Sequence, residues 1–121
     1  MFIERSSRTP TEITLWETNM REPWGDYEVA DMFSVIDNGE VVGGFAVYRD
    51  ESDGIDGIYC SGWAGHHKKV PTGDIIKQIA ENVGDVYFKT NRRTAKILLE
   101  KIGELVKKTD RFSYYIVKKG E

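Results

Sequence analysis

The sequence has little cysteine, no excess of basic charge and no long apolar run. Cys60 is its single cysteine, so an internal disulfide bond is excluded. There are 17 Lys and Arg residues against 20 Asp and Glu residues, which gives a formal net charge of −3 at pH 7. Binding to a nucleic-acid backbone or an anionic membrane needs a basic footprint, so neither partner is expected. No segment has the apolar length of a signal peptide or a membrane span, and we expect a reducing, cytoplasm-like compartment.

What the sequence does contain is typical of a folded globular chain. Its 121 residues are 40% hydrophobic and 31% charged. A chain of this length buries a real though modest core, and no repeat, linker or low-complexity segment divides it. The sequence therefore predicts one domain over residues 1–121.

Three helices are predicted from capping signals and apolar spacing. The first begins at Pro10, because Thr9 and Glu12 have the spacing of a capping box, and it ends before Pro23. The other two occupy 73–84 and 90–103, where apolar residues recur every three or four positions. Gly84 is the expected stop of the second helix. The residues expected to face inward are Ile13, Trp16 and Met20 in the first helix, Ile75, Ile76, Ile79, Ala80 and Val83 in the second, and Ala95, Leu98, Leu99 and Ile102 in the third.

Strands are predicted on both sides of the Asn38-Gly39 dipeptide, which adopts the two positive φ angles of a type I′ hairpin turn with little strain. A further strand at 57–64 contains glycines that indicate a bulge or a close approach of backbone. Two more strands, at 86–90 and 111–118, flank the third helix. This order of elements predicts an α+β or α/β fold, in which helices cover both faces of one mixed sheet.

The segment NRRTAKILLEKIG, between the strand segments DVYFKT and RFSYYIVKK, resembles the C-terminal half of the GCN5-related N-acetyltransferase (GNAT) fold. The helix residues that match are Ala95, Leu98, Glu100, Lys101 and Gly103. The hairpin DNGEVVGGFAVYR is similar to the second and third strands of that family. The resemblance implies an α+β, GNAT-like fold with a mixed, mostly antiparallel sheet and helices on both faces. In this fold the two neighbouring parallel strands that precede the third and fourth helices splay apart and receive the pantetheine arm of acetyl-CoA. We expect the strand that contains Tyr59 and the strand that contains Val86 and Phe88 to be these neighbours.

Members of the family hold the pyrophosphate of acetyl-CoA on backbone N–H groups of a loop that opens their third helix. The resemblance places GHHKKVPTGDIIKQ at this loop, which makes Lys68, Lys69 and Gly73 candidates for cofactor binding. Two residues depart from the family pattern. Pro71 lacks an N–H group, and Asp74 puts a carboxylate where the phosphate charge would lie. The sequence therefore predicts a degenerate acetyl-CoA site.

A further departure lies at Leu99, where many active members carry a tyrosine that protonates the departing CoA thiolate. A leucine cannot donate a proton. Asn91 allows two interpretations, since it either caps the third helix or contacts the pantetheine arm. We expect the cap, with Arg92 and Arg93 forming a solvated helix end.

A narrower resemblance is to small GNAT-like internal virion or head-assembly proteins of bacteriophages, which keep the fold and lose the pyrophosphate loop. It implies a protein without catalytic residues or cofactor that acts through protein–protein contacts in a virion or in host cytoplasm. Trp24 and Tyr27 are then the candidate partner-binding residues. The alternative is an acetyl-CoA-dependent N-acetyltransferase that acts on an amine. An unrelated α+β interaction domain is a third hypothesis.

Neither a metal site nor a nucleophile is expected. His66 and His67 are adjacent, so their side chains point apart on an extended segment, and no Cys or His partner stands at ligand spacing. Cys60 has no base beside it in the sequence and is expected to be a small buried strand residue. The carboxylates of the 50–56 segment are expected to lie in a solvated loop.

Overall fold

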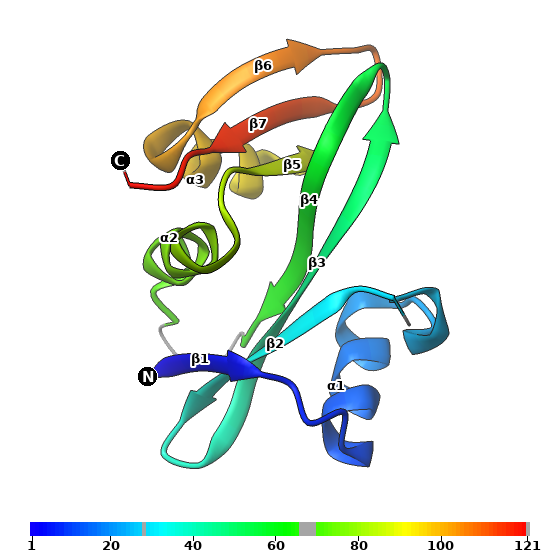
Figure 1. Cartoon of the computed structure of the whole chain (residues 1–121), viewed down its shortest axis with the longest axis vertical. Coiled ribbons are helices and arrows are strands. Elements are labelled where there is room, and N and C mark those ends of the chain that lie inside the picture. Colours follow the sequence, from blue (N-terminus) through cyan, green and yellow to red (C-terminus); the bar gives the residue numbers. More distant parts are fainter. Residues whose placement is uncertain (28, 66–69, 121) are drawn as a thin grey trace. The chain divides into compact units, whose positions relative to one another are not determined.

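The structure is a computed structural model that describes residues 1–27, 29–65 and 70–120. Figure 1 traces its helices and strands along the chain. In chain order they are β1 (Phe2–Arg5), α1 (Pro10–Met20), the 3₁₀ helix η1 (Trp24–Tyr27), β2 (Asp31–Asp37), β3 (Glu40–Ser52), β4 (Ile55–Ala64), α2 (Thr72–Val83), β5 (Val86–Thr90), α3 (Arg93–Ile102), β6 (Glu104–Lys108) and β7 (Ser113–Val117). None of the described helices is long and apolar enough to cross a membrane.

The strands form a mixed sheet in the order β1-β2-β3-β4-β5-β7-β6. Four neighbouring pairs, β1–β2, β2–β3, β5–β7 and β6–β7, are antiparallel. In contrast, β4 and β5 are parallel and pair at a single position, Tyr59 with Tyr87. This arrangement confirms the predicted α+β class with a mostly antiparallel sheet. It also confirms the predicted parallel contact between the strand of Tyr59 and the strand of Val86 and Phe88.

The chain divides into two compact units, and strands β3 and β4 each run from one into the other. The first, called here the N-terminal unit, comprises Met1–Tyr48 and Cys60–Val70. The second, the C-terminal unit, comprises Arg49–Tyr59 and Pro71–Glu121. Each unit has its own buried residues. The single domain expected over residues 1–121 stays a prediction.

Local signals place the elements of the N-terminal unit as predicted. Thr9 is the N-cap of α1 and forms a reciprocal capping box with Glu12, and Pro10 is the first helical residue. The hairpin turn between β2 and β3 has positive φ angles of 50° at Asn38 and 77° at Gly39. One core cluster of this unit comprises Trp16, Ala30, Met32 and Ala46, with the partly buried Met20, Trp24, Tyr27, Tyr48 and Trp63 packed against it.

Gly62 of β4 occupies a position where only glycine fits. A Cβ atom at this position would lie 2.2 Å from Cδ1 of Phe45 and 2.5 Å from the carbonyl oxygen of Gly44. Real side chains do not tolerate such distances, so β3 and β4 approach one another here only because residue 62 has no side chain. The predicted close approach of backbone is confirmed.

In the C-terminal unit the helices α2 and α3 bury fewer of their regularly spaced apolar residues, called here the apolar stripe of each helix, than the sequence predicts. Four of the five stripe residues of α2 are buried, but in α3 only Leu99 is, at 2% exposed. Leu98 and Ile102 are half-buried, and both lie close to Gly73 of α2. The prediction that the whole stripe of α3 is buried was therefore wrong. The remaining core of this unit comprises Tyr59, Val86, Phe88, Tyr114, Tyr115 and Val117.

Two strands and the short helix η1 have no counterpart among the predicted elements. Every residue of β6 is exposed, and β1 has no buried residue. Both are edge strands, at the two ends of the strand order. A strand that is exposed on both faces needs no alternation of apolar and polar residues, and this alternation is the signal by which strands are recognised in a sequence.

Candidate functional site

The start of α2 is the first part of the candidate cofactor site. Pro71 is the N-cap residue and makes no side-chain capping hydrogen bond. The Ile75 N–H donates to the Pro71 carbonyl oxygen at 3.0 Å, so the N–H groups of Gly73 and Asp74 precede this helical hydrogen bond. Pro71 therefore lies just before the first turn of the helix, so the N–H group that it lacks belongs to the preceding loop, and its effect on phosphate binding stays a prediction. Asp74 does lie in the first turn, as expected.

Gly73 has a packing role in addition to its place in this turn. A Cβ atom there would lie 3.4 Å from side-chain atoms of both Leu98 and Ile102, so α2 and α3 pack closely at this point. Its backbone N–H faces no such constraint and remains the candidate group for an anion. Lys68 and Lys69, the cationic candidates from the sequence, lie outside the described residues.

The connection from β5 to α3 forms the second part of the site. The N-cap of α3 is Arg92, with no side-chain capping bond, so the interpretation of Asn91 as the cap was wrong. The hydroxyl of Thr90 takes over part of this role by accepting a hydrogen bond from the Arg92 N–H at 3.1 Å. Asn91 is exposed, and its side chain makes no hydrogen bond to any described residue. Its amide is therefore available to a ligand, and its contact with a cofactor stays a prediction.

The position of the family's proton donor holds an apolar side chain buried in the core. Leu99 is 2% exposed and has no proton to give. Tyrosines do occur where β4 meets β5, since the rings of Tyr59 and Tyr87 lie 5.6 Å apart. The Tyr59 hydroxyl donates to the carbonyl oxygen of Ile55 at 2.7 Å, and burial raises the pKa of Tyr59 to about 12. A phenol held by a backbone carbonyl at that pKa is a poor acid at neutral pH.

Cys60 is buried in the N-terminal unit, as the sequence predicts. Its side chain is 3% exposed, and burial raises the pKa of its thiol far above the ordinary value. The thiolate is the nucleophilic form of cysteine, so this residue is chemically inert in the folded protein.

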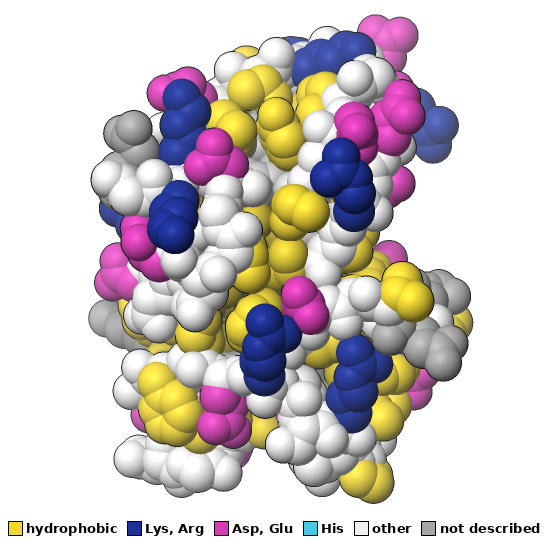
Figure 2. Space-filling view, in the orientation of Figure 1, with side chains coloured by type: hydrophobic (Ala, Val, Ile, Leu, Met, Phe, Trp, Pro, Cys, Tyr) yellow, Lys and Arg dark blue, Asp and Glu magenta, His cyan; other side chains and the backbone are white. Residues whose placement is uncertain are grey.

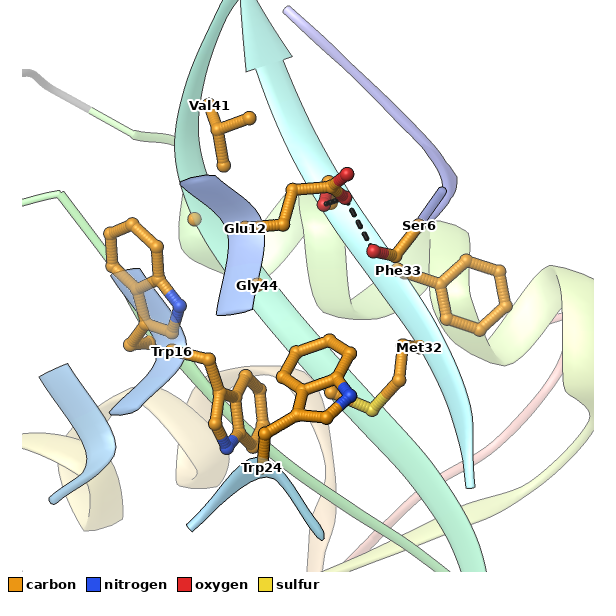
Figure 3. Close-up of a pocket in the computed structure, with 11 residues that line it drawn as sticks. Ser6, Glu12, Trp16, Trp24, Met32, Phe33, Val41 and Gly44 are labelled. Carbon is orange, nitrogen blue, oxygen red and sulfur yellow. Dashed lines mark hydrogen bonds between the residues drawn. The ribbon is translucent and has the colours of Figure 1, made fainter. Parts of the chain in front are cut away.

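The aromatic residues proposed for partner binding are built into the core of the N-terminal unit. Figure 3 shows the rings of Trp16 and Trp24 beside Met32. Trp24 meets Trp16 edge-on at 6.0 Å, and Tyr27 meets Trp16 at 5.0 Å. Both Trp24 and Tyr27 are half-buried, so much of their apolar surface is already used within the chain. Partner binding by these two residues stays a prediction.

Glu12 is the centre of a polar cluster beside these rings. Its carboxylate accepts a hydrogen bond from the Ser6 hydroxyl (Figure 3). It also accepts hydrogen bonds from the Ser34 hydroxyl and from the backbone N–H and hydroxyl of Thr9. Partial burial acts to raise the pKa of Glu12, but these hydrogen bonds outweigh it and the net pKa is lowered. The pocket here holds about 10 Å³, room for one water molecule, and is too small for a substrate. The capping pattern identifies Glu12 in the sequence, whereas nothing local indicates Ser34.

Among the described residues no group of three His, Cys, Asp or Glu side chains is placed to hold a metal ion. His66 and His67 lie outside the described part of the chain. The acidic 50–56 segment is more structured than expected, because the Asp53 carboxylate accepts a hydrogen bond from the buried Tyr114. No local sequence pattern indicates this contact between residues that are distant in the chain.

Neither a scan of the sequence against protein-family models nor a search of the curated proteins gives a match. The fold, in contrast, is similar to solved acetyltransferases over nearly the whole of both chains. The N-acetyltransferase PseH of Campylobacter jejuni in complex with acetyl coenzyme A has 15% identity and a TM-score of 0.64, covering 97% of this chain and 99% of that chain.

Two further structures give the same result. A ribosomal-protein-alanine N-acetyltransferase from Brucella melitensis has 8% identity and a TM-score of 0.64, covering 98% of this chain and 99% of that one. A GNAT family acetyltransferase from Elizabethkingia anophelis with acetyl-CoA bound has 10% identity and a TM-score of 0.63, covering 96% of both chains. The chain therefore has the GNAT fold, as the resemblance in its sequence implied. Nothing in these comparisons supports the narrower likeness to bacteriophage proteins.

Proposed function

We propose that this chain is an acetyl-CoA-dependent N-acetyltransferase that acts on an amine. The observation that carries the proposal is its GNAT fold over the full chain, with solved structures of the same fold that contain acetyl-CoA. The parallel strands β4 and β5 and the uncapped starts of α2 and α3 are consistent with it. A role through protein contacts alone has no comparable support, since Trp24 and Tyr27 are half-buried against Trp16.

The described residues fit a cofactor of this kind in part. The N–H groups of Gly73 and Asp74, at the positive end of the α2 dipole, are suited to phosphate oxygens. The exposed amide of Asn91 offers a donor and an acceptor to the amide groups of a pantetheine arm. The Asp74 carboxylate opposes phosphate binding, so we expect weak affinity for acetyl-CoA.

Acetyl-CoA would supply the acetyl group of its thioester to the amine of the acceptor, with the CoA thiolate as the leaving group. Leu99 cannot protonate the leaving sulfur, and a positioned acid typically contributes about 10²–10⁴-fold to a rate. A thiol with an ordinary pKa of about 8.5 leaves as a thiolate without such help. The chemistry is therefore slower without a tyrosine at residue 99 but still possible.

The test combines calorimetric titration of acetyl-CoA with mass spectrometry of a panel of amines incubated with protein and acetyl-CoA. We expect saturable binding and acetylation above the protein-free background. Asn91→Ala should weaken binding, whereas Lys77→Ala, an exposed change on the outer side of α2, should not. Absence of both binding and acetylation in the native protein would overturn the proposal. Binding that is unchanged in Asn91→Ala would overturn only the role of that residue.

A further inference from the structure

A polar cleft of about 320 Å³ lies in the C-terminal unit, away from the starts of α2 and α3. It is formed by the β3–β4 turn, the end of β5 and the β6–β7 turn. The residues that line it are Ser52, Asp53, Lys89, Thr109, Asp110, Arg111 and Phe112. Its volume is enough for a small metabolite, in contrast to the one-water pocket beside Glu12.

One wall of the cleft is fixed by a chain of hydrogen bonds with a single direction. The Lys89 ammonium donates to the Ser52 hydroxyl at 2.9 Å, and the Tyr114 hydroxyl donates to the carboxylate of Asp53. The Tyr114 oxygen also lies 2.8 Å from the Ser52 oxygen. Because Tyr114 has given its only proton to Asp53, Ser52 must be the donor in that contact. The Lys107 ammonium adds a hydrogen bond to the Asp53 backbone carbonyl, so the β3–β4 turn is held firmly against β5, β6 and β7.

The cleft contains cations that no carboxylate of the described residues neutralises. The Lys89 Nζ lies 4.3 Å from the centre of the Phe112 ring, and the Arg111 Cζ lies 5.8 Å from it. Neither side chain forms an ion pair with a described residue, and the Arg111 guanidinium makes no hydrogen bond within the described part of the chain. Two cations at one aromatic ring form a ready site for a carboxylate or another anion.

The same cleft contains carboxylate oxygens with unused capacity. The Asp110 side chain has no hydrogen bond or ion pair to any described residue, and Asp53 uses one of its two carboxylate oxygens for Tyr114. Figure 2 shows acidic and basic side chains interspersed at the end of the molecule where Figure 1 places the β3–β4 and β6–β7 turns. Opposite charges that line one cavity without pairing with each other match a ligand that carries both signs.

We propose that this cleft binds a small zwitterion of the free α-amino acid type. The ligand's carboxylate lies at Lys89 and Arg111, and its ammonium group lies at Asp53 and Asp110. An ion pair inside a cleft excludes part of the water that screens exposed charges, so both contacts contribute to affinity. The proposal concerns binding alone and does not depend on acetyl transfer.

The test is calorimetric titration of the full chain with the standard free L-amino acids at millimolar concentration, without acetyl-CoA. We expect saturable binding of at least one of them. Arg111→Gln and Asp110→Asn should each weaken that binding by roughly 10-fold or more, because each removes a charge-assisted contact. Lys77→Gln, which removes an exposed cation of α2, is the matched control and should leave binding unchanged. Thermal unfolding of each variant shows that it is folded.

Modified forms of the amino acid that binds separate a zwitterion site from a simple anion site. The N-acetyl form lacks the ammonium group, the amide form lacks the carboxylate, and both should bind roughly 10-fold more weakly. The proposal is overturned if no free amino acid binds, if binding survives both cleft substitutions, or if the N-acetyl form binds as well as the free amino acid.

Discussion

The buried hydroxyl of Tyr114 on β7 donates its hydrogen bond to the carboxylate of Asp53 in the β3–β4 turn, 61 residues earlier in the chain. Tyr114 is 0% exposed, so this contact and the one with Ser52 are the means by which its polar atom is satisfied. The two hydrogen bonds hold the tip of the β3–β4 hairpin in the C-terminal unit.

Tyr114→Phe should lower the free energy of unfolding by about 1–3 kcal/mol, because it removes the hydrogen bonds that the Tyr114 hydroxyl makes with Asp53 and Ser52. Urea unfolding followed by circular dichroism measures this. Tyr87→Phe is the matched control, since the Tyr87 hydroxyl has no hydrogen bond to a described residue. Equal stability of the two variants would contradict the assignment.

Glu12 should make stability depend on pH in the acid range. Its pKa is lowered in the folded protein, so its contribution is present above the ordinary value of 4.5 and is lost as pH falls below it. Glu12→Gln should cost about 1–2 kcal/mol at neutral pH, and the difference from the native protein should shrink in acid. Urea unfolding at a series of pH values measures this, with Glu4→Gln, an exposed change on β1, as control. A difference that is independent of pH would rule out the role given to the carboxylate.

Cys60 should make the free energy of unfolding fall as pH rises in the alkaline range, the opposite direction to the effect of Glu12 in acid. Burial raises its thiol pKa in the folded protein, whereas the unfolded chain ionises near the ordinary value of 9.0. A raised pKa gives stability that is present below the unfolded value and is lost as pH rises above it. Between about pH 9 and 10 the native protein should therefore lose about 1 kcal/mol that Cys60→Ala does not lose. If the free energy of unfolding of the native protein and of Cys60→Ala changes equally with pH across this range, the thiol is accessible to solvent in the folded protein.

Gly62→Ala should destabilise the N-terminal unit by about 1–3 kcal/mol, because the added methyl group meets the Gly44 carbonyl and the Phe45 ring. Gly25→Ala is the control, since a Cβ atom at Gly25 meets nothing within 4 Å. Thermal unfolding of the two variants gives the comparison. If Gly62→Ala is as stable as the control, β3 and β4 are farther apart than the structure places them.

Asp74→Asn should strengthen acetyl-CoA binding about 2- to 5-fold, because it removes a negative charge from the first turn of α2 where a phosphate would bind. Glu81→Gln removes a carboxylate from the other end of the same helix and should have no such effect. Calorimetric titration measures both affinities. A weaker complex with Asp74→Asn would show that the phosphates bind elsewhere.

The helices and hairpins with strong local signals could be predicted from the sequence. The capping box of Thr9 and Glu12, the turn at Asn38-Gly39 and the stop of α2 at Gly84 each act within a few residues, and the structure confirms all three. The GNAT resemblance also gave the correct fold. Within the candidate site, however, the sequence pattern places the N-cap of α3 one residue too early. Asn is a preferred cap, but the N-cap is Arg92, and its N–H donates to the hydroxyl of Thr90.

The locally coded elements follow from the sequence alone, since capping, turn formation and apolar spacing depend on neighbours in the chain. Which distant polar groups meet depends on how the chain folds in three dimensions. Glu12 lies with Ser34, 22 residues away, and Asp53 with Tyr114, 61 residues away. Exposed edge strands such as β6 likewise form because they pair with a neighbouring strand, in this case β7. Such contacts depend on the path of the whole chain, so no short stretch of sequence encodes them.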